Sequence, residues 1–131
     1  MMTLTEFREA RDLLSGIISN TNLIHSPYYS KRTGGEVYIK PENMQVTGAY
    51  KVRGACYKVS TLTDEEKAKG LVTASAGNHA QGVAFAAQRA GIEATIVMPT
   101  TTPLVKVNNT KDYGAHVVLE GSCFDESAAV A

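Results

Sequence analysis

Residues 71–82 read LVTASAGNHAQG, a sequence typical of an α/β fold. Its leading apolar residues predict a short buried strand, and the alanine-rich run at 83–90 predicts a helix that Gly91 ends. Strand, glycine turn and helix together form a βα junction, which presents the free N–H groups of the helix at the carboxyl end of the strand. Those groups and the helix dipole favour a bound anion, to which Asn78 and His79 add side-chain donors.

From this junction onward the chain alternates strictly between strand and helix patterns. Short β-branched runs predict strands buried on both faces of a parallel sheet, and Thr102 before Pro103 predicts an N-cap and first helical residue. Right-handed crossovers would then give an α/β fold, a small doubly wound parallel sheet with flanking helices. The predicted elements are strands 71–75, 94–98 and 116–119, helices 78–90 and 103–113, and a helix from Ser122. Because the sequence stops inside that last helix, we expect a fragment of a longer protein.

The residues before the junction predict three helices and a further strand. Thr3 with Glu6 matches a capping box, and so does Thr63 with Glu66. The predicted elements are a helix from Thr3 to about Ser19, a polar surface connection at 21–30, a strand at 36–40, a helix from Ala49 and a short helix closed by Gly70.

Composition narrows the class of protein. The 131 residues are enough for one domain with a real core, and 13 basic residues balance 13 acidic ones. This balance argues against a nucleic-acid or membrane-surface role. No apolar run reaches the roughly 20 residues of a spanning helix, and the N-terminus lacks a secretory signal. We therefore expect a cytoplasmic protein in which Cys56 and Cys123 are unpaired core thiols.

Most familiar catalytic motifs are missing from the sequence. There is no Gly-x-Gly-x-x-Gly, no phosphate-binding P-loop and no Gly-x-Ser-x-Gly, and no pair of histidines or cysteines has metal-ligand spacing, so we expect no metal. Lys51 is the remaining candidate, although a lysine beside a tyrosine at a helix start is usually a solvated surface residue. His79 taken alone would be a helix-capping or core histidine.

Two stretches considered together change this interpretation. Residues 42–55 read ENMQVTGAYKVRGA, and residues 74–82 read ASAGNHAQG. Both closely resemble the threonine dehydratases (threonine ammonia-lyases), pyridoxal-phosphate enzymes of the tryptophan-synthase β-like fold, or fold type II. The agreement spans most of residues 37–121. The chain departs from the family in having Ala49-Tyr50 where members often have Ser-Phe, and the tyrosine keeps the ring that flanks the cofactor.

The resemblance implies roles for individual residues. Lys51 would hold pyridoxal 5'-phosphate as a Schiff base and act as the base at the substrate Cα, tasks that suit a desolvated amine. Tyr50 would flank the cofactor, and Asn78 would bond its ring hydroxyl. The implied substrate-binding residues are Ser75, Ala76, Gly77, Asn78 and His79. The family's later phosphate-binding loop and the residue facing the pyridine nitrogen have no counterpart in this sequence.

The resemblance also implies an activity and a domain division. Residues 1–48 would join the large domain and residues 49–131 would form an incomplete small domain. The full-length parent, a homo-oligomer, would convert L-threonine to 2-oxobutanoate and ammonia by α,β-elimination, and the fragment alone would be inactive. Serine dehydratase or serine racemase is the alternative enzyme, acting on L-serine, and a serine stands in serine racemases where this chain has Ala76. A non-catalytic small-molecule-binding module is the other alternative, against which the retention of Lys51 argues.

Overall fold

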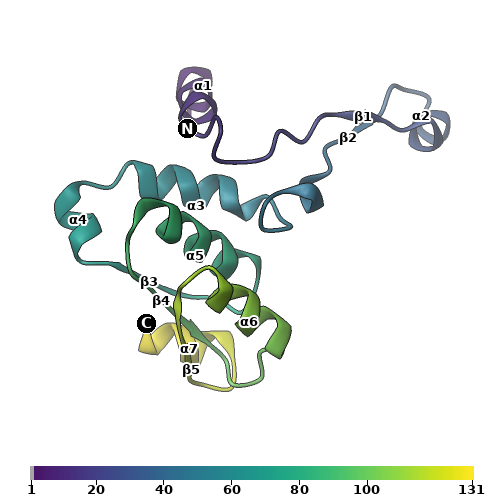
Figure 1. Cartoon of the computed structure of the whole chain (residues 1–131). Coiled ribbons are helices and arrows are strands. Elements are labelled where there is room, and N and C mark those ends of the chain that lie inside the picture. The colour runs from purple at the N-terminus through teal and green to yellow at the C-terminus, as the bar shows by residue number, and fades with distance from the viewer. Residues whose placement is uncertain (1) are drawn as a thin grey trace.

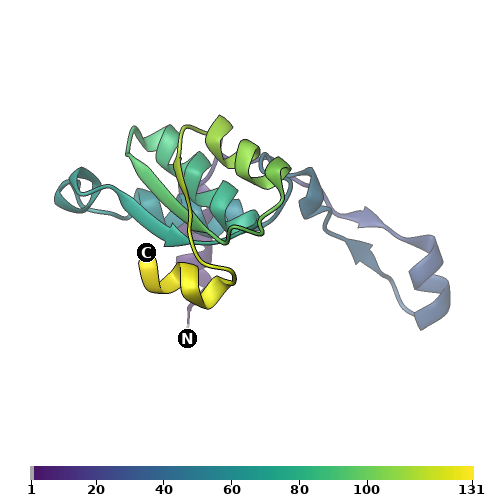
Figure 2. The same ribbon diagram turned by 90° about the horizontal axis from the view of Figure 1, so that it is seen from below.

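A computed structural model describes residues 2–131. They form a body, built around a parallel sheet, and a slender arm that extends from it (Figure 1). The arm is an antiparallel pair of two-residue strands with a helix between them, and Ile24 pairs with Ile39. Its elements are β1 (Ile24–His25), α2 (Pro27–Thr33) and β2 (Tyr38–Ile39). Both views show the arm extending away from the body (Figures 1 and 2).

The sheet of the body has three parallel strands in the order β3-β4-β5. The two crossover helices, α5 and α6, lie on one face of it, and α7 lies on the other (Figure 2). The bounds are β3 (Leu71–Ala74), α5 (Asn78–Ala90), β4 (Ala94–Met98), α6 (Leu104–Asp112), β5 (His116–Leu119) and α7 (Phe124–Val130). The predicted doubly wound α/β sheet is confirmed.

Alanines on α5 allow that helix to lie close to the sheet. Ala80, Ala84 and Ala87 are each at most 1% exposed and pack against Ile96 and Met98 of β4, which are fully buried. Burial of a side chain of this size stabilises a fold by roughly 1.5–3 kcal/mol. The small side chains on the helix and the large ones on the central strand therefore fix where the N-terminus of α5 lies.

A second layer of helices covers the outer side of α5. α3 packs along α5 through Val52, Ala55 and Val59, and Leu14 closes the same cluster from the end of α1. The helices in this part of the body are α1 (Leu4–Leu13), α3 (Lys51–Ser60) and α4 (Asp64–Ala68), and the short 3-10 helix η1 (Glu42–Met44) precedes α3. The first helix of the sequence is thereby tied to the helix that Lys51 begins.

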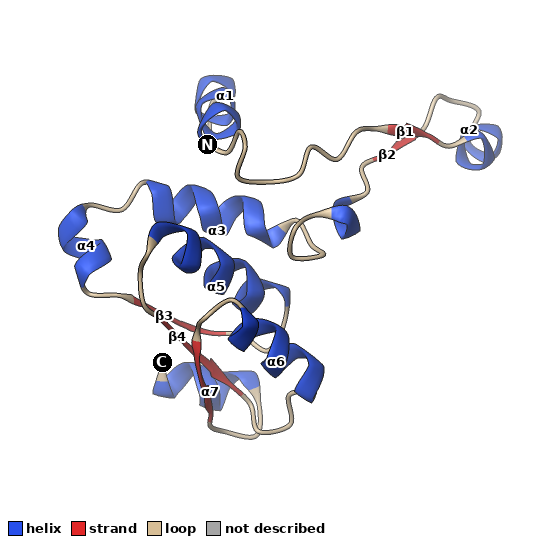
Figure 3. Ribbon diagram, viewed as in Figure 1, coloured by secondary structure: helices blue, strands red, loops and turns tan. Residues whose placement is uncertain are grey.

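Most elements lie where the sequence predicts them (Figure 3), and the capping boxes at Thr3 and Thr63 are both present. The first helix is shorter than predicted, since it ends at Leu13 and not near Ser19. Residues 21–30 are mostly exposed, as a surface connection should be, but they also hold β1 and the start of α2, which the sequence did not predict. The strand predicted at 36–40 shrinks to Tyr38–Ile39. β5 is an edge strand with exposed ends, so it is not buried on both faces as its β-branched residues suggested.

Thr102 and Cys123 also differ from expectation. Pro103 has an extended ψ of 135°, so it becomes the N-cap itself and α6 begins one residue later, at Leu104. The Thr102 hydroxyl is buried without a hydrogen-bond partner among residues 2–131. Cys56 is buried as predicted, whereas Cys123 is exposed and is no core thiol.

Candidate active site

Lys51 and the N-terminus of α5 are brought together by the packing of α3 on α5. The two helices run side by side in the same direction (Figure 1), so their N-terminal ends meet at one end of the pair. Gly82, in the second turn of α5, faces the backbone of Lys51: a Cβ added there would lie 3.3 Å from the carbonyl carbon of Lys51. The two stretches that suggested a site in the sequence are therefore in direct contact.

Ser75 organises the turn between β3 and α5. Its backbone N–H donates to the Val97 carbonyl, which continues the sheet ladder by one residue. Its Oγ accepts the backbone N–H groups of Ala80, at 3.2 Å, and Gly77, at 3.4 Å. The hydroxyl therefore caps α5, a role that the N-cap residue Gly77 has no side chain to fill.

The first turn of α5 keeps donors available for a ligand. Within residues 2–131, the backbone N–H groups of Asn78 and His79 have no acceptor, and the Asn78 side chain is exposed. Lys106 of α6 adds a cation, since its Nζ lies 4.0 Å from where a Cβ on Gly77 would be. Free N–H groups, the positive end of a helix and an ammonium group together form a place for an anion.

Lys51 is the first residue of α3 and its side chain is exposed. Its Nζ lies 5.6 Å from the centre of the Tyr50 ring, within the range of a cation–π contact. Burial, and secondly the charge of Lys51, lower the pKa of His79 below its usual 6.5. At neutral pH His79 is therefore an uncharged imidazole that lies within electrostatic reach of the lysine.

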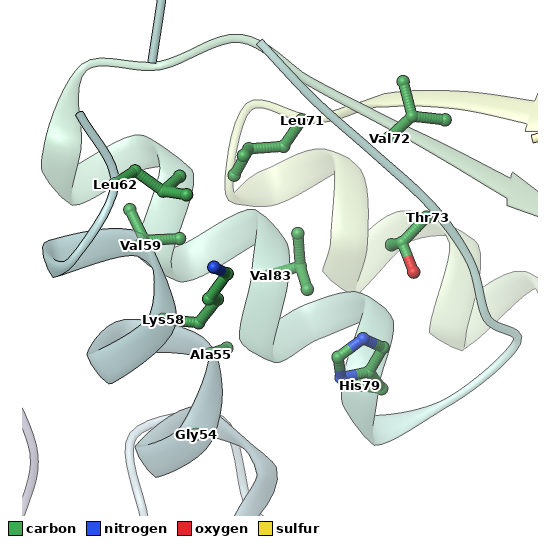
Figure 4. Close-up of a pocket in the computed structure, with 10 residues that line it drawn as sticks. All are labelled: Gly54, Ala55, Lys58, Val59, Leu62, Leu71, Val72, Thr73, His79 and Val83. Carbon is green, nitrogen blue, oxygen red and sulfur yellow. The ribbon is translucent and has the colours of Figure 1, made fainter. Parts of the chain in front are cut away.

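An open pocket of about 240 Å³ lies between α3, α5 and β3, and His79 stands at one end of it (Figure 4). Its walls are mainly apolar, and Lys58 reaches into it from α3. Lys51, Ser75 and Asn78 are not among the lining residues. Of the predicted site residues, the pocket thus includes only His79, and the others gather at the helix ends beside it.

Several residues near Lys51 were not singled out from the sequence. Glu42 and Arg53 form an ion pair across the loop that precedes Lys51, and the Tyr113 hydroxyl donates to the Val46 carbonyl in the same loop at 3.1 Å. The contacts join residues 11 and 67 positions apart, and the resemblance at 42–55, which includes Glu42 and Arg53, does not predict that these two residues pair. They are visible only once the chain is folded.

Two negative findings apply to residues 2–131. No helix among them has both the length and the apolar character needed to cross a membrane. No three histidine, cysteine, aspartate or glutamate side chains of this region come together as a metal site.

Two curated proteins similar to this chain are named as an L-threonine ammonia-lyase and a catabolic L-threonine dehydratase. The chain is 52% identical to the L-threonine ammonia-lyase of Thermotoga maritima, over 97% of its own length and 32% of that protein. It is also 52% identical to the catabolic L-threonine dehydratase of Staphylococcus aureus strain N315, over 97% of itself and 37% of that protein. The chain thus spans about a third of the length of these relatives.

Solved structures agree in fold. Maize serine racemase superimposes with a TM-score of 0.90 at 36% identity, with 97% of this chain and 39% of that protein covered. Threonine deaminase isoform 2 of Solanum lycopersicum gives a TM-score of 0.85 at 42% identity, over 99% of this chain and 37% of the other. The family model described as "Pyridoxal-phosphate dependent enzyme" matches residues 14–131. The chain therefore belongs to the pyridoxal-phosphate dependent enzyme family.

Proposed function

We propose that this chain is part of a threonine ammonia-lyase, which converts L-threonine to 2-oxobutanoate and ammonia by α,β-elimination. The observation that carries the proposal is the close contact between Gly82 and the backbone of Lys51, which joins the start of α3 to the N-terminal part of α5. The charge of Lys51 also acts on His79 in the first turn of α5. This arrangement occurs in a chain that is 52% identical to a protein named L-threonine ammonia-lyase. The substrate is itself an amino acid with a carboxylate, which suits such a pair of groups.

The residues present fit pyridoxal phosphate in their chemistry. Lys51 offers an exposed primary amine, which can bond the cofactor's aldehyde carbon, and Tyr50 offers an exposed aromatic face next to that amine. Asn78 supplies an exposed amide at the first turn of α5, suited to the ring hydroxyl. When bound, the cofactor supplies an electron sink for the substrate's Cα.

The chain's own groups bind the substrate and move its proton. The free N–H groups of Asn78 and His79 would hold the carboxylate, and Ser75 would donate to it from its hydroxyl. Because the pKa of His79 is lowered, its ring adds no charge at neutral pH and acts as a neutral partner. Lys51, as a free amine, would take the proton from Cα and deliver it to the β-hydroxyl, which would leave as water. A second water would then hydrolyse the imine form of the product to 2-oxobutanoate and ammonia.

Lys51→Ala in the full-length protein tests this proposal. We expect loss of the absorbance of the lysine-bound cofactor and loss of 2-oxobutanoate formation. Lys69→Ala is the matched control, since Lys69 is an exposed lysine at the end of α4 that does not line the pocket beside His79. The proposal fails if Lys51→Ala keeps either the absorbance or the activity, or if Lys69→Ala loses both.

The domain division belongs to the same proposal. We propose that residues 1–48 join a large domain and that residues 49–131 belong to the small one. The arm supports this division, because it carries exposed apolar side chains that need a cover: Leu23, Ile24, Tyr28, Tyr29, Tyr38 and Ile39. Amides of residues 22–40 should exchange slowly in the full-length protein and fast in the 131-residue chain. The 131-residue chain alone should turn over no threonine.

Assembly, location and the serine reaction complete the proposal. The full-length protein is proposed to be a cytoplasmic homo-oligomer, which light scattering of the purified protein and fractionation of cells would test. Serine racemase is the second candidate activity, favoured by the TM-score of 0.90 to the maize serine racemase. Ala76 argues against it, because an alanine methyl group can neither give nor take a proton on the opposite face of Cα.

A further inference from the structure

Residues 45–50 form the loop that ends at Lys51, and residues outside the loop make hydrogen bonds to it and to the elements on either side. Tyr50, the N-cap of α3, makes no side-chain hydrogen bond to the helix. Gly48 has a positive φ of 70°, a backbone conformation that residues other than glycine rarely adopt. The position of Lys51 therefore depends on contacts that the rest of the chain makes with the loop and with the first turn of α3.

One of these contacts is a bidentate ion pair between Glu42, before the loop, and Arg53, after it. Arg53 donates from Nε to Glu42 Oε2 at 2.8 Å and from Nη2 to Glu42 Oε1 at 2.8 Å. Glu42 precedes the loop, in η1, and Arg53 lies in the first turn of α3, two residues after Lys51. A paired guanidinium and carboxylate have a fixed relative orientation, so the two ends of the loop are fixed as well.

The segment after α1 extends this ion pair. The Thr21 hydroxyl, which is buried, donates to Glu42, and Arg53 Nη2 also donates to that hydroxyl oxygen at 3.3 Å. Lys40 donates to the Thr21 carbonyl. The Arg53 guanidinium, with lesser help from Thr21 and Lys40, holds the pKa of Glu42 at about 2, so the carboxylate is charged at any physiological pH.

Two further side chains hold the loop itself. Gln45 is 5% exposed, and its amide makes both possible bonds to the backbone of Ser19: the Ser19 N–H donates to Oε1 at 3.1 Å and Nε2 donates to the Ser19 carbonyl at 2.7 Å. The Tyr113 hydroxyl donates to the Val46 carbonyl, and the Tyr113 ring packs edge-on against Phe85 of α5.

We propose that the Glu42–Arg53 ion pair fixes the position of Lys51 relative to the N-terminus of α5. Glu42 and Arg53 are then positioning residues of the active site. This inference rests on the proposed function of Lys51. A role in stability alone explains the placement poorly. A cation in the first turn of a helix opposes the helix dipole, so Arg53 is unfavourable there by itself, and the Glu42 carboxylate compensates for its charge. An arrangement that is locally unfavourable thus lies next to the reactive lysine, which needs a defined position.

The test uses two variants of the full-length protein. Glu42→Gln keeps nearly the same shape and removes the charge, and Arg53→Lys keeps the charge. Lysine keeps the charge but cannot make the paired contact. We measure kcat and KM for L-threonine with the cofactor bound. In cofactor-free protein we measure by mass spectrometry the rate at which acetic anhydride modifies Lys51, relative to Lys58 on the same helix. Arg11→Gln is the matched control, because it removes an exposed ion pair with Asp12 on α1.

We expect both variants to lower kcat by about tenfold or more while KM changes less, since misplacement of a reacting group by even 1 Å costs about a hundredfold. The Lys51 to Lys58 labelling ratio should change by about threefold or more in both, and Arg11→Gln should change neither quantity. A lowered unfolding temperature with unchanged kcat and labelling ratio would overturn the positioning role. Loss of activity in Lys51→Ala together with full activity in Arg53→Lys refutes this inference alone. Activity retained in Lys51→Ala refutes the proposed function.

Discussion

Gly82 packs so closely against the backbone of Lys51 that even a methyl group on it would be tightly crowded. A methyl group on Gly82 would be 3.3 Å from the Lys51 carbonyl carbon and 3.3 Å from the Val52 nitrogen. Both contacts are with backbone atoms, which cannot rotate away as the end of a flexible side chain can. The absence of a side chain at this one position therefore sets the spacing between the lysine and the anion-binding end of α5.

Gly82→Ala should impair catalysis more than stability. Alanine gains about 1 kcal/mol in helix propensity, while crowding of a packed contact costs about 1–3 kcal/mol, so the free energy of unfolding should fall by only about 1 kcal/mol. Displacement of Lys51 should lower kcat by about tenfold or more. Urea unfolding and steady-state kinetics measure the two effects.

Gly54→Ala is the control for this substitution. Gly54 lies within α3, and a Cβ there would meet nothing within 4 Å. The variant should gain about 0.5–1 kcal/mol in stability and keep full activity. An equal loss of activity in both variants would mean that helix rigidity, and not the contact with Lys51, is what matters.

Ser75→Ala should weaken both α5 and substrate binding. Removing the hydroxyl leaves the N–H groups of Gly77 and Ala80 without their acceptor, which should cost about 1 kcal/mol in unfolding free energy. The lost bond to the substrate carboxylate should raise KM for L-threonine about tenfold or more. Ser60→Ala, at the end of α3, removes a hydroxyl that donates to the Tyr57 carbonyl, and it should leave KM unchanged.

The titration of His79 should report on the charge of Lys51. Its pKa lies below 6.5 through burial first and the nearby lysine second, so Lys51→Met should move the pKa upward, partway to 6.5, while burial persists. Because the unfolded state binds the proton more readily, the stability that His79 contributes is lost as the pH falls below 6.5. NMR of the imidazole protons measures the midpoint.

Lys67→Met serves as the control for this titration. It removes a lysine from α4, whose charge is not among the causes of the His79 shift. It should leave the midpoint where it is. A midpoint that moves equally in both variants would mean that the net charge of the protein, and not Lys51, lowers the pKa.

Ala76→Ser should add racemisation to elimination. Removal of the Cα proton needs one base, whereas inversion needs a second group that returns a proton from the opposite face. A hydroxyl at position 76 would supply it next to Ser75. Chiral analysis of L-serine incubated with the full-length protein should find D-serine only with the variant. Substantial D-serine from the unmutated protein would contradict the proposed reaction and favour the serine racemase alternative.

The sequence was most informative where structure is local. The strand at 94–98 and the helix at 78–90 are predicted to the residue, because apolar runs, alanines and a terminal glycine encode them within one short stretch. The arm was predicted less well. β1 and β2 have two residues each and pair with one another across α2, so neither carries enough local pattern to be recognised.

The candidate site divides in the same way. Lys51 and residues 75–79 stand out as motifs, and the structure places them at the adjoining ends of α3 and α5. Gln45 and Arg53 belong to the resembling stretch at 42–55, but the sequence assigns them no role, and Tyr113 lies outside both stretches. Their contacts with Ser19, Glu42 and Val46 are seen only in the fold. Long-range pairing depends on how the helices pack, which no single stretch encodes.

The two hydrogen bonds that Ser75 accepts also decide what kind of ligand atom it can meet. A hydroxyl oxygen has two lone pairs, and both are engaged by backbone N–H groups of its own chain. Only its hydrogen is left to offer. A carboxylate oxygen satisfies that hydrogen, whereas an ammonium group would find no free lone pair on the Ser75 oxygen. The loop can thus tell the two ends of an amino acid apart by polarity alone, before any bond is made or broken.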